Sequence, residues 1–340
     1  MKRRLPIAVV IPVYQGRHHV PGAIASVRAQ TIEVDEIIVV DDGSSDGGAE
    51  TARALGVTVL RQENAGCGPA RNRGIAHARS PWIALLDADD RWEPEKLERQ
   101  WRARDGDPAV RLLSSDCATF VDDTRMIQSS SLAGTWTYAR VPKTRLAPGT
   151  VEVSSAALAA WLPRGQFLVA SALLLERSLV IDDGIAFAAL PAERISHIAE
   201  DIEWYLRAVR RTDVIVVEAP LVRYAVGAPS LSSSAGRIHY GLVRLGEMIA
   251  LAPDRYVARA GVAFARDRLR RETLAIAAFL RALDFERARA TIADVRRHRR
   301  SLDLVVLAAI LRVARQPSVA RILRRVRERW RARSRCPRNR

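Results

Sequence analysis

The 340-residue sequence predicts an α/β fold with a mostly parallel central sheet flanked by helices, followed by an all-helical C-terminal extension. Three observations point to this fold class. Short apolar runs of the kind that form buried strands recur through the first 115 residues. Stretches of helical length separate these runs, and strands that alternate with helices form parallel, helix-covered sheets. Beyond about residue 236, helical periodicity replaces the strand pattern.

The predicted strands of the first half are its buried-type apolar runs, at residues 7–13, 36–40, 57–60, 82–86 and 110–113. The predicted helices lie between them, at about 20–30, 46–55, 68–79 and 94–104. Each strand therefore returns to the sheet through a helix, which favours parallel neighbours.

The pattern weakens between about 114 and 165, where Ser, Thr, Pro and Gly are frequent, and this predicts loops with an antiparallel excursion. Residues 166–176 are apolar again, residues 199–210 predict a helix, and residues 214–217 predict a further strand. We divide the chain into an α/β domain over 1–235 and a helical, Arg-rich extension over 236–340.

The positive charge of the chain is concentrated near its C-terminal end. Residues 241–340 contain 26 Arg, no Lys and 9 acidic residues, whereas the first 240 contain 28 basic and 29 acidic residues. A nearly neutral first part is compatible with a metal site, because its carboxylates are not surrounded by excess Arg. The basic part predicts an anionic partner or a solvated appendage.

Cysteine usage and hydropathy predict a cytoplasmic protein. Cys67, Cys117 and Cys336 show no metal-binding or redox spacing, so we expect reduced thiols. The N-terminal residues enter a strand pattern at once, and we expect no signal peptide. The longest apolar stretch, residues 304–310, is far shorter than the ~20 residues that span a bilayer, so no membrane span is expected.

Carboxylates directly follow two predicted strands, as Asp41-Asp42-Gly43-Ser44-Ser45-Asp46 and as Asp87-Ala88-Asp89-Asp90. Ligands of open α/β sheets bind at the carboxyl ends of the strands. Oxygen ligands gathered there suit Mg²⁺ or Mn²⁺, which in turn suits a diphosphate. A nucleotide-dependent transferase is therefore the leading interpretation.

Each motif also has a purely structural interpretation. The first acidic segment fits an Asx-rich turn, and Asp87 to Asp89 fits an acidic turn or a helix N-cap. Residues 66–71 fit either a plain loop or a glycine-rich helix entry near a phosphate. Glu200-Asp201 fits a solvated helix start that the helix dipole stabilises.

Taken together, the segments resemble a family 2 glycosyltransferase of the GT-A fold in order and spacing. The resemblance extends over roughly residues 5–230 and is carried by residues 9–14, 38–46, 64–74 and 85–90. Residues 199–207 are similar to the downstream acidic helix motif of that family. Between 115 and 195, where such enzymes read their acceptor, the match is loose.

The resemblance implies roles for the nucleotide-sugar site. Pro12, Tyr14 and Asp42 would line the base pocket, with Asp42 facing the base. Arg71 would lie near the diphosphate, and Asp87 would approach the ribose.

The resemblance also implies that Asp89 ligates Mn²⁺ or Mg²⁺ and that Asp201 is the catalytic base, with Glu200 beside it. The chemistry of sugar transfer from a nucleoside diphosphate requires the same groups. A divalent cation stabilises the charge that develops on a departing nucleoside diphosphate. A carboxylate opposite the leaving group accepts the proton of the attacking hydroxyl. One metal site and one distant carboxylate predict single displacement with inversion.

Two classes of protein remain open. The first is an inverting, metal-dependent glycosyltransferase that acts on a glycan or lipid-linked acceptor in cell-surface polysaccharide assembly. The second is a catalytically silent nucleotide-sugar-binding or scaffold protein that docks through its basic tail. Intact Asp42, Asp89 and Asp201 favour the first class.

The basic tail has three interpretations. Val319, Ile322, Leu323, Val326 and Trp330 share one helix face with Arg around it, which suits a helix lying on an anionic membrane. Such a helix would place the protein on the inner face of the plasma membrane. A solvated appendage fits the pattern as well. Nucleic acid is disfavoured, because no recognition module accompanies the charge.

Overall fold

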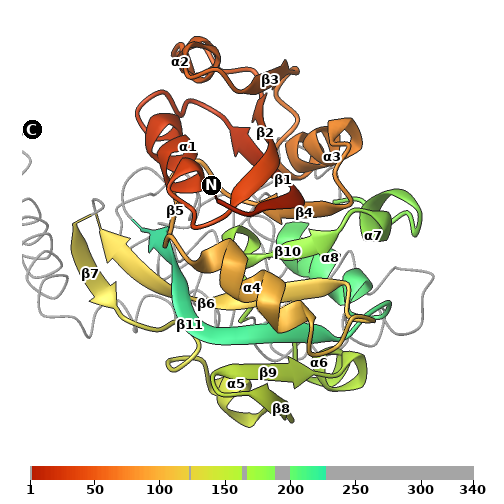
Figure 1. Cartoon of the computed structure of the whole chain (residues 1–340). Helices are drawn as coiled ribbons and strands as arrows, with labels where there is room; N and C mark the ends of the chain where they lie inside the picture. Colours follow the sequence, from red (N-terminus) through yellow and green to blue (C-terminus); the bar gives the residue numbers. More distant parts are fainter. Residues whose placement is uncertain (1, 122–123, 163–166, 188–199, 227–340) are drawn as a thin grey trace, which may run out of the picture.

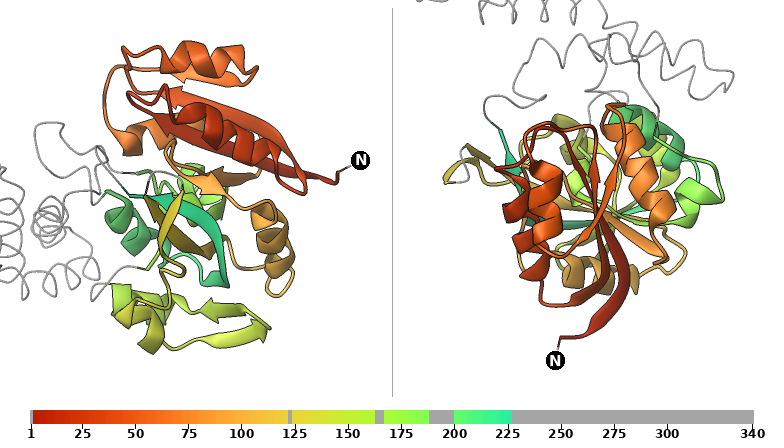
Figure 2. Two further views of the ribbon diagram at one scale, coloured as in Figure 1. Left: turned by 90° about the vertical axis from the view of Figure 1, so that its left-hand side faces the viewer. Right: turned by 90° about the horizontal axis from the view of Figure 1, so that it is seen from above.

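The computed structural model describes residues 2–121, 124–162, 167–187 and 200–226 (Figure 1). This part of the chain forms an 11-stranded mixed sheet with the order β3-β2-β1-β4-β10-β6-β11-β9-β8, while β5 pairs with β11 and β7 with β6. Helices cover both faces of the sheet (Figure 2). Helices α1, α2 and α4 contribute to one hydrophobic core, and α3, α6, α7 and α8 to the other.

The first half of the sheet is parallel, as predicted. Its strands are β1 (Arg4–Val13), β2 (Glu33–Asp41), β3 (Thr58–Arg61) and β4 (Trp82–Leu85). Its helices are α1 (Val20–Arg28), α2 (Gly48–Ala54), α3 (Cys67–His77) and α4 (Lys96–Arg104). All of these elements begin and end within a few residues of the predicted bounds.

Strand β1 shows why these runs are continuously apolar. Val9 and Ile11 belong to one core, whereas Ala8 and Val10 belong to the other. Side chains alternate between the two faces of a strand, so a strand with helices on both faces needs apolar residues at every position.

The second half is mixed, which confirms the expected antiparallel excursion. Its strands are β5 (Arg91–Trp92), β6 (Leu112–Val121), β7 (Arg125–Gln128), β8 (Thr144–Ala147), β9 (Thr150–Val153), β10 (Leu174–Glu176) and β11 (Val214–Ala225). Its short helices are α5 (Trp136–Arg140), α6 (Ser155–Trp161), η2 (Ala170–Ala172), α7 (Ser178–Ile181) and α8 (Glu200–Ala208). Strand β10 is antiparallel to both β4 and β6, and β8 and β9 form an antiparallel pair.

The predicted end of the strand at residue 113 is wrong, because β6 continues to Val121 and pairs with β11 from Leu112 to Phe120. This continuation contains polar residues, so it lacks the apolar pattern from which a buried strand is predicted. The Asp116 carboxylate is buried and accepts hydrogen bonds from the Leu132 N–H at 3.0 Å and from the Ser130 hydroxyl. A buried polar side chain with internal partners is tolerated in a strand but breaks the apolar pattern.

The predicted extension over 236–340 lies outside the described residues, and so does Cys336. Cys67 and Cys117 are free thiols. Within the described ranges, no helix combines the length and the apolar character that a bilayer span requires.

Candidate active site

The two acidic segments leave the sheet at the same edge, on either side of β1. Strand β1 lies between β2 and β4 (Figure 1). The Asp42 N–H donates to the Val13 carbonyl at 2.8 Å, and the Leu86 N–H donates to the Val10 carbonyl at 3.1 Å. These bonds join the first residue after β2 and the first residue after β4 to β1, and the two acidic loops begin there.

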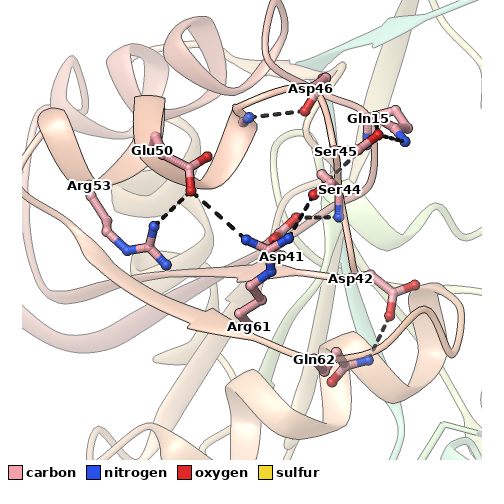
Figure 3. A network of polar contacts seen from close by, with 11 residues as sticks. Gln15, Asp41, Asp42, Ser44, Ser45, Asp46, Glu50, Arg53, Arg61 and Gln62 are labelled. Carbon is pink, nitrogen blue, oxygen red and sulfur yellow. Dashed lines mark hydrogen bonds and ion pairs between the residues drawn. The ribbon is translucent and has the colours of Figure 1, made fainter.

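The Asp42 carboxylate organises the loop that leads into α3. It is buried and accepts hydrogen bonds from the Gln62 side chain at 2.7 Å, from the Ala65 N–H at 2.9 Å and from the Gly66 N–H at 2.8 Å (Figure 3 shows the Gln62 contact). Both carboxylate oxygens thus bind the chain. The contact of Asp42 with a nucleotide base stays a prediction.

The rest of the Asp41–Asp46 segment is the Asx-rich turn that the alternative interpretation describes. Asp41 accepts a hydrogen bond from the Ser44 N–H at 3.0 Å and forms an ion pair with Arg61 at 3.3 Å (Figure 3). Asp46 accepts from the Gly48 N–H at 2.9 Å, at the start of α2. Gly43 has φ +83°, and a Cβ there would lie 3.0 Å from the Asn64 nitrogen, so only glycine fits this turn.

Pro12 and Tyr14 differ in exposure. Pro12 is buried near the end of β1, whereas the Tyr14 side chain is 55% exposed at the same sheet edge. Gln15 follows with φ +50° and donates its N–H to the Ser44 hydroxyl at 3.0 Å. The turn therefore fixes the backbone beside an exposed aromatic ring on which a base could stack.

Arg71 is buried on α3 and turned toward Asp87. Its Nη2 lies 2.7 Å from Oδ1 of Asp87, a residue whose side chain is 29% exposed. Its guanidinium also lies over the Phe187 ring, 5.4 Å from the ring centroid. Arg71 thus holds Asp87 in place, and its buried position differs from that of a surface arginine that reaches into solvent.

Asp87, Asp89 and Asp90 occupy three different environments. Burial and the charge of Asp87 raise the pKa of Asp89, while His19 and Arg91 act in the opposite direction. Asp90 is fully buried, and burial together with the charges of Asp89 and Asp87 raises its pKa well above the ordinary value. Its Oδ2 accepts the Ser171 hydroxyl at 2.5 Å, and its Oδ1 accepts the Ala225 N–H at 2.8 Å.

The donors of this loop fit a cation that is shared with a diphosphate. In the described part of the chain, no group of three His, Cys, Asp or Glu side chains could hold a metal by itself. Magnesium is usually held by one or two carboxylates together with substrate phosphates. Asp89 is partly exposed, next to the paired Asp87 and the enclosed Asp90, which makes it the candidate ligand.

The described part of helix α8, Glu200–Ala208, carries Asp201. Asp201 is partly exposed, and its Oδ1 accepts the Ile202 N–H at 2.8 Å. The side chain of Glu200 lies outside the description. Trp204 and Tyr205 are fully buried and pack in the hydrophobic core.

Phe187 connects α3 and α8. Its ring stacks on Trp204 with a centroid separation of 4.7 Å and an interplanar angle of 8°. The Asn72 side chain on α3 pairs with the backbone of Phe187, donating to its carbonyl at 2.7 Å and accepting from its N–H at 2.8 Å. Since Arg71 lies on the same ring, Asp87 and α8 are joined by a continuous series of contacts.

The sheet order and the carboxylates at the ends of the two parallel strands that flank β1 define a protein of the GT-A glycosyltransferase fold. Residues 8–146 match the family model for glycosyl transferase family 2. This segment of the chain is similar to that family.

Relatives by sequence match only part of the chain. An uncharacterized glycosyltransferase of Rickettsia bellii (strain RML369-C) is 40% identical over 98 residues, 28% of this chain and 14% of the relative. A second relative is the teichuronic acid biosynthesis glycosyltransferase TuaG of Bacillus subtilis (strain 168). It is 33% identical over 100 residues, which are 28% of this chain and 40% of the relative. The chain thus spans less than half the length of these relatives.

Solved structures match over a longer range. The 1–349 fragment of S. aureus TarS in complex with UDP-GlcNAc has a TM-score of 0.54 at 17% identity, over 87% of this chain and 92% of that one. The mannosyltransferase PcManGT from Pyrobaculum calidifontis, in complex with GDP-Man and Mn²⁺, has a TM-score of 0.57 at 17% identity, over 93% and 82%. At such identity the likeness shows the fold.

Proposed function

We propose that the protein transfers a sugar, with inversion and with the help of Mn²⁺ or Mg²⁺, from a nucleoside diphosphate donor to a hydroxyl of a glycan or lipid-linked acceptor. The observation that carries the proposal is the acidic loop after β4, which places a partly exposed Asp89 next to the Arg71–Asp87 pair inside the family 2 segment. Cell-surface polysaccharide assembly is the proposed context, in keeping with the name of the Bacillus subtilis relative.

On the donor side, Tyr14 stacks on the base while Asp42 holds the loop that faces it. Arg71 orients Asp87 toward the ribose, and Asp89 holds the cation. The cation supplies Lewis-acid stabilisation of the leaving diphosphate. The complexes of two structural neighbours with UDP-GlcNAc and GDP-Man support a nucleotide-sugar donor.

On the acceptor side, Asp201 accepts the proton of the attacking hydroxyl. Its partial exposure suits a group that meets a substrate. A carboxylate within hydrogen-bond reach of the attacking hydroxyl acts as a general base. Glu200 is next to it in the sequence.

Release of free nucleoside diphosphate tests the proposal. Full-length protein is incubated with UDP-, GDP- and dTDP-sugars and a cell-envelope extract, with Mn²⁺ or with a chelator. We expect metal-dependent release with one donor class and none with Asp89→Ala. Binding of a donor by thermal shift, without any turnover in the presence of acceptor extract, would instead support the silent binder.

We also propose that the basic C-terminal region holds the enzyme at an anionic membrane surface on the cytoplasmic side. The support is its excess of Arg over acidic residues, since each basic residue near such a surface contributes about 1 kcal/mol. Deletion of residues 316–340 is expected to abolish sedimentation with phosphatidylglycerol vesicles at moderate salt, with phosphatidylcholine vesicles as the control. Unchanged sedimentation contradicts the membrane role.

A further inference from the structure

Asp90 and Ser171 form a buried, hydrogen-bonded contact between three segments that are far apart in the sequence. The carboxylate of Asp90 accepts the Ser171 hydroxyl at 2.5 Å and the Ala225 N–H at 2.8 Å. The Ser171 hydroxyl in turn accepts the Asp87 N–H at 3.0 Å. The acidic loop, η2 and the end of β11 therefore meet at one carboxylate.

The available donor groups determine the direction of each hydrogen bond between these segments. A serine hydroxyl has a single proton, which Ser171 donates to Oδ2 of Asp90. The lone pairs of the hydroxyl are then free for the Asp87 N–H. The acidic loop, whose acids face the proposed donor site, is thus fixed at the Asp87 backbone by a single side chain, that of Ser171 in η2.

The backbone of Ser171 and its neighbour is also held by the β5–α4 segment. The Trp92 indole N–H donates to the Ser171 carbonyl at 2.8 Å, and the Gln100 amide donates to the next carbonyl, of Ala172, at 2.8 Å. The Lys96 ammonium lies over the Trp92 ring, 4.0 Å from its centroid. Ser171, Gln100 and Lys96 are completely buried. This support from the β5–α4 segment keeps η2 from following a displaced acidic loop.

The acidic loop needs such support because it gathers like charges. Asp87, Asp89 and Asp90 lie within four residues, and the charge of Asp87 acts on both of the others. Without a cation, repulsion favours conformations in which these carboxylates move apart. A loop that is already held in place loses less conformational entropy when its ligand binds.

We propose that Ser171, through Asp90 and the Asp87 backbone, is a positioning residue that pre-organises the acidic loop for a cation-bound nucleoside diphosphate. The inference rests on the proposed function only for the identity of the ligand. Ser171 contacts neither donor nor acceptor in this scheme, so it acts through Asp87 and Asp89.

Ser171→Ala tests the proposal, and Ser115→Ala is its matched control. Ser115 is a buried serine of β6 whose hydroxyl has no hydrogen-bond partner in the described structure, so its removal does not touch the acidic loop. Affinity is measured by calorimetry with Mn²⁺ and whichever of UDP, GDP or dTDP the wild-type protein binds. We expect Ser171→Ala to weaken binding about five- to tenfold, the scale of one lost hydrogen bond, and Ser115→Ala to leave it unchanged.

Hydrogen exchange of the protein without ligand gives a second readout that does not depend on the proposed function. Faster exchange confined to the peptide that contains residues 85–90 is expected for Ser171→Ala. Ser171→Thr, which keeps the hydroxyl, should preserve both protection and affinity. Equal affinity and equal exchange in Ser171→Ala and wild type overturn the inference, whereas a wild-type protein that binds none of the three nucleotides contradicts the proposed function instead.

Discussion

The half of the sheet that carries the two acidic loops and the half that packs against α8 differ in how closely they follow the apolar sequence pattern. The first half is parallel, and its helices and strands follow the apolar pattern closely. The second half mixes parallel and antiparallel pairs and includes polar buried strands such as β6. The two relatives described above match 28% of the chain by sequence, whereas the two structural neighbours match 87% and 93% of it.

The largest effect is expected from Asp89→Ala in the first half. If Asp89 holds the cation, its loss removes the group that joins protein and diphosphate, and transfer should fall by about 10³-fold or more, in line with the loss of a strong electrostatic stabiliser. Initial rates of nucleoside diphosphate release measure this. Asp105→Asn, an exposed acid at the end of α4, is the control and should behave as wild type. Comparable activity of the two variants would remove Asp89 from the site.

Asp201→Asn tests the second half in a different way. A general base contributes about 10²- to 10⁴-fold, so transfer should fall by that factor while nucleotide binding, which belongs to the first half, is retained. Thermal shift with the nucleotide and Mn²⁺ measures binding. Glu203→Gln, two residues after Asp201 and paired with Arg207 at 2.6 Å, is the control. Loss of both nucleotide binding and transfer in Asp201→Asn would contradict this division, in which the first half binds the nucleotide and the second half supplies the base.

The sequence predicts the structure best where a single physical rule determines it. A buried parallel strand requires an apolar run, and so β1, β2 and β4 were predicted with the acids at their ends. The continuation of β6 was missed because Asp116 satisfies its hydrogen bonds within the fold, which no local pattern reveals. Ser171 was missed for a similar reason. Its partners Asp87 and Asp90 lie more than 80 positions away, so only the folded chain brings them together.

A smaller effect on stability is expected where the halves meet. Trp204 is fully buried, stacks on Phe187 and donates its indole N–H to the Ile185 carbonyl at 2.7 Å. Trp204→Leu should lower the free energy of unfolding by about 3 kcal/mol, since it removes buried area and leaves a carbonyl without its donor. Trp136→Leu, at a tryptophan that is 54% exposed, should cost less than about 1 kcal/mol. Urea denaturation compares the two, and equal costs would show that the contact between α3 and α8 does not hold the halves together.

The smallest effect concerns Glu36, a partly exposed residue of β2 in the first half. Burial raises its pKa, but hydrogen bonds from the Ser80 and Arg79 N–H groups and the Ser80 hydroxyl, each at 2.9 Å, outweigh this and lower the pKa below its usual 4.5. A carboxyl group with a lowered folded-state pKa stabilises the fold above its unfolded pKa, and this stabilisation is lost as the pH falls through the folded value.

Glu36→Gln should therefore lower the free energy of unfolding at pH 7 by about 1 kcal/mol or less, because the site is partly screened by water. Urea denaturation at pH values from 7 down to 3 should show the difference from wild type shrinking once the pH drops below the ordinary carboxyl range. Glu33→Gln, at an exposed glutamate that begins the same strand, is the control and should match wild type at each pH. A difference that stays constant with pH would mean that the shape of the side chain, and not its charge, stabilises the link between β2 and the turn before β4.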